Sequence, residues 1–149
     1  ILGTGDENYI EQLRHIKNRF PDRVSLNLEY DATKPQYIYA GADVFLMPSR
    51  YEPCGIGQMI ALKYGTIPIV RQTGGLNDTV DNYDTSSKRG NGFKFYNYDS
   101  RDLIFQINNA FNLYLHSKSD WEQLIINAMN SRFSLTDSAK KYLELYQML

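Results

Sequence analysis

Short apolar runs alternate with amphipathic stretches along most of the chain. Four of these runs have the length of strands and are followed by polar segments. They are residues 24–28, 42–47, 66–70 and 92–96. The stretches between them have apolar residues at helical spacing, so strands and helices alternate. We therefore expect an α/β fold with a parallel sheet of Rossmann type.

Helices are expected between these runs and at both ends of the chain. The predicted helices cover residues 7–20, 32–40, 55–64 and 76–80, followed by three more between about residue 99 and residue 149. Pro35 fits a helix if it lies in the first turn, where its missing N–H has no partner to lose. Either Ser134 or Thr136 is expected to cap the last helix.

The pattern also makes two more specific predictions, one about a strand and one about a helix. Pro68 falls inside the expected strand 66–70, and a proline cannot donate to a ladder, so it indicates an edge strand or a bulge. In the expected helix 55–64, the residues predicted to face the core are Met59, Ile60 and Leu62.

The first residues have the pattern of a chain that begins within a structural element. Ile1 and Leu2 read as the end of a buried strand, and residues 3–6 read as a strand-to-helix turn. A domain seldom begins inside a strand. We therefore expect the 149 residues to be a fragment of a longer domain.

Composition argues against several classes of function. The 16 basic and 17 acidic residues give a net charge of −1, so we expect neither a nucleic-acid partner nor a basic membrane-binding patch. No apolar run approaches the roughly 20 residues of a membrane span. The single cysteine cannot form an internal disulfide, which favours a reducing compartment such as the cytoplasm, or a plastid in a plant.

The spacing of potential ligands and nucleophiles predicts neither a metal site nor a catalytic thiol. His15 and His116 are far apart in the sequence, and Asp78 and Asp81 have no third ligand beside them. Cys54 has no histidine in its own motif to act as a base, which argues against a nucleophilic role.

Glycine-rich segments follow several of the predicted strands, where ligands of such sheets bind. In residues 48–58, Glu52 leaves the strand end, and Gly55 and Gly57 open the next helix. The unpaired N–H groups at a helix start favour a phosphate, so Glu52 would face sugar hydroxyls instead of the anion. The spacing fits equally well a Glu52 that caps the helix and glycines that only form the turn.

Two further segments are weaker candidates for ligand contact. Thr73, Gly74 and Gly75 follow the strand 66–70, and the two glycines permit a positive φ or the close approach of another backbone. Ligand contact and a plain turn remain equally open there. Tyr30 lies just past the strand 24–28, where an exposed aromatic ring would stack on a nucleobase and a buried one would pack in the core.

Two long segments resemble the signature of bacterial-type glycogen and starch synthases. They are residues 40–59, which include Glu52-Pro-Cys-Gly55, and residues 62–80, which include Thr73-Gly-Gly-Leu76. Residues 91–95, 133–134 and 141–146 are similar to the family's C-terminal part. Related retaining glycosyltransferases usually carry Glu-Gly-Phe-Gly, so the motif at Glu52 separates this family from them.

The resemblance implies the C-terminal domain of a two-domain GT-B enzyme, lacking its first strand and helix. Residues 1–149 would form one partial nucleotide-sugar-binding domain. The implied partners are an ADP-glucose donor, an α-1,4-glucan acceptor and the N-terminal domain of the same enzyme. Glucose would be added to the non-reducing end of the glucan with retention of configuration, and no metal or cofactor is implied.

The resemblance also implies roles for individual residues. Glu52 would bind the donor glucose and stabilise positive charge at the transferring carbon. Cys54 and Gly55 would line the glucose through backbone groups, and Ile56 and Gly57 would offer N–H groups to the distal phosphate.

The remaining implied contacts are with the nucleotide and its surroundings. Tyr30 would stack on adenine, and Thr73, Gly74 and Gly75 would lie nearby. Gly57 departs from relatives that have Thr or Asn there, which removes any side-chain contact from that position.

Two other functions remain as alternatives. One is a retaining glycosyltransferase that uses a UDP- or GDP-sugar, and the other is a non-catalytic module that binds a nucleotide sugar or a glucan. The family's basic residues that neutralise the diphosphate lie upstream of Ile1, so the isolated chain is expected to be inactive.

Overall fold

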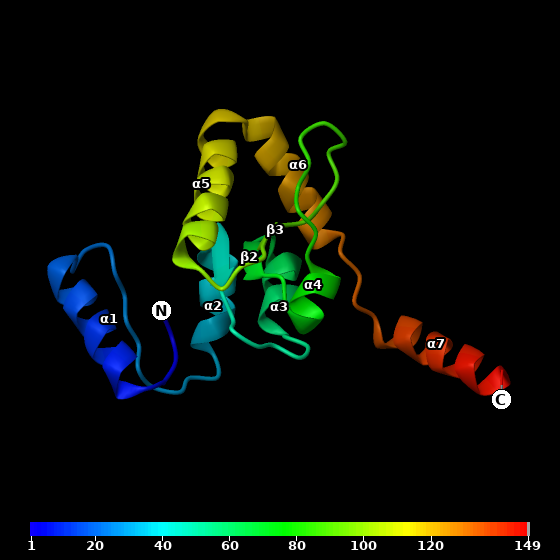
Figure 1. Ribbon diagram of the computed structural model, residues 1–149, viewed down its shortest axis with the longest axis horizontal. Coiled ribbons are helices and arrows are strands. Elements are labelled where there is room, and N and C mark those ends of the chain that lie inside the picture. The colour runs from blue at the N-terminus through cyan, green and yellow to red at the C-terminus, as the bar shows by residue number, and fades with distance from the viewer. Residues whose placement is uncertain (149) are drawn as a thin grey trace. The chain divides into compact units, whose positions relative to one another are not determined.

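The computed structural model describes residues 1–148, which form two compact units, Ile1–Ile38 and Tyr39 to the chain end (Figure 1). The elements are, in chain order, α1 (Glu7–Arg19), α2 (Lys34–Gly41), β1 (Val44–Met47), α3 (Gly57–Tyr64), β2 (Ile67–Arg71), α4 (Gly74–Thr79), β3 (Phe93–Phe95), α5 (Ser100–His116), α6 (Lys118–Met129) and α7 (Leu135–Gln147).

The first unit is built around α1 and one parallel bridge. Leu2 pairs with Asn27, with the Gly3 N–H donating to Asn27 O at 3.0 Å. The strand expected over residues 24–28 is thus reduced to this bridge. Asp6 caps α1 by accepting a hydrogen bond from the Asn8 N–H at 2.9 Å.

The second unit contains a parallel sheet of three strands in the order β1-β2-β3. Val44 lies opposite Ile67 in the β1–β2 pair, and Ile69 lies opposite Phe93 in the β2–β3 pair. The prediction of an α/β fold with a parallel sheet is therefore confirmed. The carboxyl ends of all the strands lie at one edge of the sheet, where the loops after β1 and β2 begin.

Pro68 corrects the expectation of an edge strand or bulge, because it lies in the central strand β2 in regular register opposite Phe45. The Ile67 N–H points towards β1 and donates to Asp43 O at 3.0 Å. Successive N–H positions alternate sides along a strand, so the Pro68 nitrogen faces β3. The pairing with β3 starts only at Ile69, and no ladder bond is lost at Pro68.

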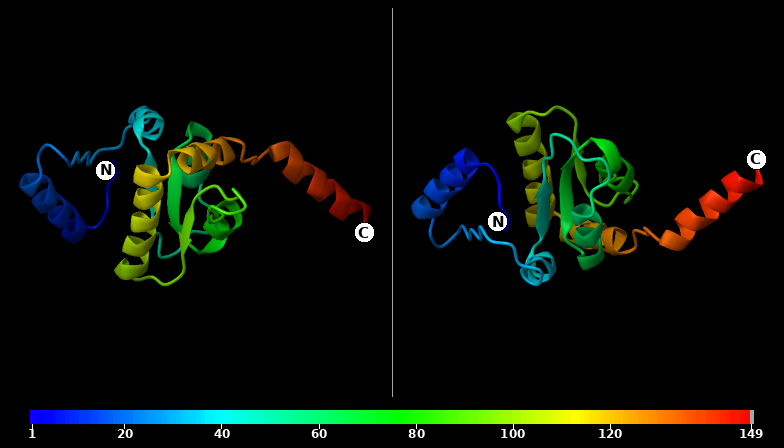
Figure 2. Two further views of the ribbon diagram at one scale, coloured as in Figure 1. Left: turned by 90° about the horizontal axis from the view of Figure 1, so that it is seen from above. Right: turned by 90° about the horizontal axis from the view of Figure 1, so that it is seen from below.

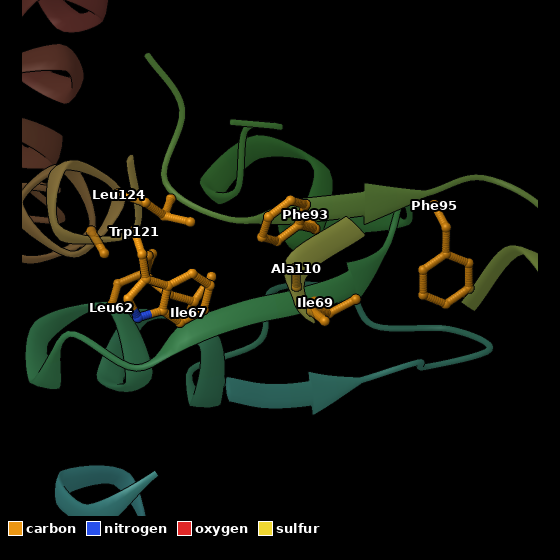
Figure 3. Packing of buried hydrophobic residues seen from close by; sticks show 9 residues of the cluster. Leu62, Ile67, Ile69, Phe93, Phe95, Ala110, Trp121 and Leu124 are labelled. Carbon is orange, nitrogen blue, oxygen red and sulfur yellow. The ribbon is translucent and has the colours of Figure 1, made fainter. Parts of the chain in front are cut away.

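Helices lie on both sides of the sheet (Figure 2), and the residues of β2 from Ile67 to Val70 are buried. Ile67 and Ile69 belong to the main core with α5 and α6, whereas Val70 packs against Leu76 and Val80 beside α4. Figure 3 shows the main core, whose buried members are Leu62, Ile67, Ile69, Phe93, Phe95, Ala110, Trp121, Leu124 and Ala128. Burial on both faces explains why the sequence of β2 is continuously apolar instead of alternating.

The buried face of α3 agrees with the predicted one only at Leu62. Its buried residues are Gln58, Ala61 and Leu62, whereas Ile60 is 37% exposed. Positions 58, 61 and 62 form one stripe at i, i+3 and i+4. The apolar pattern hid this stripe because its first member is a polar glutamine.

The last three helices form as predicted, but their apolar stripes are unequally buried. Trp121 and Leu124 of α6 are buried, while Phe111 and Tyr114 of α5 are partly exposed. The N-cap of α7 is Ser134, which accepts a hydrogen bond from the Thr136 N–H at 3.1 Å. Within residues 1–148, no helix is long and apolar enough to cross a lipid bilayer.

Candidate functional site

The loops that follow β1 and β2 meet at the carboxyl edge of the sheet. The Gly75 N–H, at the start of α4, donates a hydrogen bond to Pro53 O in the first loop at 3.0 Å. The backbone also comes very close at the neighbouring residues. A Cβ atom placed on Gly74 would lie 2.0 Å from Glu52 O, and one placed on Gly75 would lie 2.2 Å from Cys54 O.

The glycine pair therefore shows both features that favour glycine, a positive φ and the close approach of another backbone. Gly74 has φ +45°, and both glycines allow a second backbone to approach. The residues of the two sequence motifs, far apart along the chain, form one continuous surface. Thr73 precedes α4 as its N-cap residue without a side-chain capping bond.

Arg71, the last residue of β2, fastens the start of the first loop. Its Nε donates to Ser49 O at 2.8 Å, and its Nη2 donates to Arg50 O. The guanidinium also lies 5.7 Å from the centre of the Tyr98 ring. This anchor could not be predicted from the sequence, because an arginine at the end of a strand has the pattern of an ordinary solvated residue.

The start of α3 offers backbone N–H groups without a side-chain cap. Ile56, the N-cap residue, has no side-chain oxygen and is 64% exposed. Gly55 has φ +72° and Ile56 has φ −115° with ψ −31°, a left-handed residue followed by a right-handed one. Successive N–H groups in such a turn form a concave anion-binding surface, to which the positive end of the helix dipole adds.

Glu52 does not cap α3, which excludes one of the alternatives left open by its spacing. Its side chain is half-buried in the loop. Among residues 1–148, no lysine or arginine forms an ion pair with it. The carboxylate therefore has no ion-pair partner within the described chain, and it belongs to the loop that leads into α3.

Gly57 lies close to two aromatic side chains. A Cβ atom there would lie 3.0 Å from the Tyr39 hydroxyl and 3.1 Å from Cζ of Phe45. The rings of Tyr39 and Phe45 pack edge to face at 5.3 Å, and burial raises the pKa of Tyr39. A threonine or asparagine at position 57 would require these rings to shift by a few tenths of an ångström, which the sequence alone did not reveal.

The other predicted residues lie as follows. The thiol of Cys54 is free and exposed on the same loop as Glu52. Tyr30 belongs to the first unit, where its side chain is 90% exposed, so the core-packing alternative is wrong. In the described part of the chain, no group of three or more His, Cys, Asp or Glu residues is placed to hold a metal ion.

Residues 1–130 match the family described as glycosyl transferases group 1. The chain belongs to this family. Group 1 glycosyl transferases that resemble it include glycogen synthases of Thermotoga maritima, 52% identical over 147 residues, and Alkaliphilus metalliredigens, 50% identical over 149 residues. These alignments cover 99% and 100% of the chain, but 30% and 31% of the relatives.

A solved structure agrees with the assignment of the chain to this family. The catalytic domain of starch synthase IV from Arabidopsis thaliana, bound to ADP and acarbose, is 37% identical and superposes with a TM-score of 0.86. The match covers 98% of this chain and 31% of that one. The parallel α/β fold is that of the C-terminal domain of GT-B glycosyltransferases, and the chain spans about a third of such proteins.

Proposed function

We propose that the chain is the donor-binding domain of a retaining glucosyltransferase that uses ADP-glucose and extends an α-1,4-glucan. The observation that carries the proposal is the loop from Glu52 to Gly57, which combines an unpaired carboxylate with uncapped N–H groups at the carboxyl edge of the sheet. The identity of about half to glycogen synthases over the whole chain supports the choice of donor and acceptor.

In this proposal the two ends of the loop act on opposite charges. The N–H groups at Gly55, Ile56 and Gly57 stabilise the negative charge that develops on the departing diphosphate. Glu52 lies against the sugar and stabilises the positive charge that develops at the transferring carbon. Cys54 contributes through its backbone, and Thr73 supports the loop from the start of α4.

The nucleotide and the acceptor complete the proposed set of partners. Tyr30 stacks on the adenine ring, and the N-terminal domain of a GT-B enzyme supplies the glucan-binding side of the cleft. The reaction uses no metal and no cofactor. A reducing compartment such as the cytoplasm suits the single unpaired cysteine.

A chimeric enzyme tests the proposal. The matching segment of the Thermotoga maritima glycogen synthase is replaced by this chain, and labelled glucose is supplied as ADP-, UDP- or GDP-glucose with glycogen as acceptor. We expect incorporation into glycogen, most of it from ADP-glucose. The chain alone should give none, because no second domain is present to bind the acceptor.

The outcomes separate the competing functions. Transfer mainly from UDP- or GDP-glucose would assign the chain to another retaining glycosyltransferase. A folded chimera that binds ADP but transfers no glucose would favour a non-catalytic binding module. Incorporation of glucose by the isolated chain would contradict the proposal that this chain binds the donor and a second domain binds the acceptor.

A further inference from the structure

Gln58 is a fully buried polar residue beneath the candidate site, with 0% of its surface exposed. Its Nε2 donates hydrogen bonds to Gly55 O at 3.0 Å and to Cys54 O at 3.2 Å. Thr79 Oγ1 also lies within hydrogen-bonding distance of this nitrogen at 3.1 Å, so the two hydrogens of the amide are shared among three oxygens. Burying an amide costs free energy unless the amide is hydrogen-bonded. These contacts therefore offset the cost of burying the Gln58 side chain.

Thr79 continues the connection into the second loop. Its Oγ1 accepts the bond from Gln58 and donates to Gly75 O at 2.7 Å. The Gly75 N–H in turn is held by Pro53 O at 3.0 Å. The amide of Gln58 and the hydroxyl of Thr79 thus join the loop after β1 to the start of α4 from the buried side.

The bonds of Gln58 also fix which way two N–H groups of the first loop point. All the described peptide bonds are trans, so each C=O points opposite to the N–H of the same peptide unit. The carbonyls of Cys54 and Gly55 both point at the buried amide. The N–H groups of Gly55 and Ile56 therefore point away from it, to the outer side of the loop.

The amide of Gln58 packs directly against Gly55 in this turn. A Cβ atom on Gly55 would lie 2.5 Å from Oε1 of Gln58, and Gly55 already requires a positive φ of +72°. Oε1 is buried and has no hydrogen-bond partner among the described residues. The amide is thus held by its nitrogen alone, facing the two loop carbonyls.

We propose that Gln58 and Thr79 are positioning residues of the donor site, which orient the N–H groups of Gly55 and Ile56 towards the diphosphate and keep the two loops in register. This inference rests on the proposed function. The buried amide and the hydroxyl contact no ligand themselves. They set the direction of the Gly55 and Ile56 N–H groups, which do.

Four substitutions in the chimeric enzyme test the inference. Gln58→Met keeps the volume but removes the amide, Thr79→Val removes the hydroxyl, and Thr79→Ser keeps it. Thr66→Val is the matched control. Thr66 is buried, like Gln58, and its Oγ1 lies within hydrogen-bonding distance of the carbonyls of Tyr39 and Ala42, outside both loops.

Turnover should separate positioning from stability. Misplaced N–H groups weaken a transition state more than they weaken ground-state binding, so Gln58→Met and Thr79→Val should lower kcat about tenfold to a hundredfold with a smaller change in KM for ADP-glucose. Thr79→Ser should restore most of kcat. Thr66→Val should lower the midpoint of thermal unfolding without lowering kcat.

The amide signals of the isolated chain provide a second readout that does not depend on turnover. In the unsubstituted chain, ADP should shift the NMR signals of Gly55 and Ile56. These shifts should be lost in Gln58→Met and retained in Thr66→Val.

The experiments distinguish failure of the proposed function from failure of the positioning role. If the unsubstituted chimera transfers no glucose and ADP shifts no loop signal, the proposed function is wrong. If the unsubstituted proteins respond but Gln58→Met and Thr79→Val keep normal kcat and normal shifts, the positioning role is wrong. Equal losses of kcat in Thr79→Val and Thr66→Val would also overturn it, since they would reduce the effect to stability.

Discussion

At Gly75, the absence of one carbon atom allows two loops to meet. Gly75→Ala would place a Cβ atom 2.2 Å from Cys54 O, so the backbone must shift. We expect the free energy of unfolding to fall by about 1–3 kcal/mol, as for other overpacked sites. Gly41→Ala is the control, because its Cβ atom meets nothing within 4 Å. Denaturant unfolding compares the two, and equal stabilities would show that the loops need not touch.

Glu52 is the residue whose proposed role depends most on charge. In the chimeric enzyme, Glu52→Gln keeps the shape of the side chain but removes its charge. A preorganised charge that acts mainly in the transition state is worth about 2.7–4 kcal/mol, so kcat should fall by roughly a hundredfold to a thousandfold. The affinity for ADP, measured by calorimetry, should change little, because Glu52 faces the sugar.

Cys54→Ser is the matched control for Glu52→Gln, since it alters a side chain of the same loop whose backbone alone is used. It should leave kcat close to that of the unsubstituted enzyme. Near-normal turnover in Glu52→Gln would remove this carboxylate from the mechanism, and complete loss in Cys54→Ser would restore a role for the thiol.

On the scale of elements, a polar cluster fastens the long loop before β3 to α6. Asp120 of α6 accepts a hydrogen bond from Tyr83 Oη at 2.9 Å and forms an ion pair with Lys88. The Lys88 ammonium and the Tyr83 hydroxyl lower the pKa of Asp120. Asn127 of α6 adds bonds to the carbonyls of Lys88 and Gly90 at 2.8 and 2.9 Å. These polar contacts hold the loop on α6, and the Tyr83 ring also packs against the main core.

Because of the Tyr83 hydroxyl in this cluster, we expect the stability of the fold to depend on pH in the alkaline range. Burial, and then the hydrogen bond to Asp120, raises the pKa of Tyr83 from its ordinary value of 10.0 to about 12. On unfolding, Tyr83 releases its proton at the lower pH, so the unfolded chain binds fewer protons between these two values. The contribution to stability is complete below pH 10 and is lost as the pH rises towards about 12.

Denaturant unfolding across this pH range measures the effect. Tyr83→Phe should lose less stability than the unsubstituted chain as the pH rises. Tyr142→Phe removes an exposed hydroxyl of α7 and should behave like the unsubstituted chain. Parallel curves for Tyr83→Phe and the unsubstituted chain would contradict the coupling between Tyr83 and Asp120.

On the scale of the whole molecule, the choice of nucleotide tests the proposed role of Tyr30. The isolated chain should bind ADP at about millimolar concentration, near −4 kcal/mol, since only part of the phosphate site is present. It should bind UDP more weakly, because a purine stacks over a larger area of the Tyr30 ring than a pyrimidine does. Titration followed by NMR shifts measures both affinities.

Tyr30→Ala should remove most of the preference for ADP while leaving the shifts at Ile56 and Gly57. Tyr9→Ala removes another exposed ring of the first unit and is the control. An equal response of the unsubstituted chain to ADP and UDP would count against an ADP-glucose site.

Local patterns by themselves determined the fold class, the helices and the position of the site. The period of apolar residues defines each element, and the carboxyl ends of parallel strands must share an edge, so the motifs at Glu52 and Thr73 could be expected to lie close together. Resemblance to glycogen and starch synthases added a glycosyltransferase family, and residues 1–130 match the group 1 glycosyl transferases.

Only the tertiary structure decided how the backbone of the site is held. Pro68 is acceptable in a central strand because its nitrogen faces a gap in the pairing, and Gln58 occupies a core position because three oxygens surround its amide. Such contacts join residues distant in the chain and depend on the direction of single N–H and C=O groups. A pattern of polar and apolar positions carries no information about those directions, so it could not reveal them.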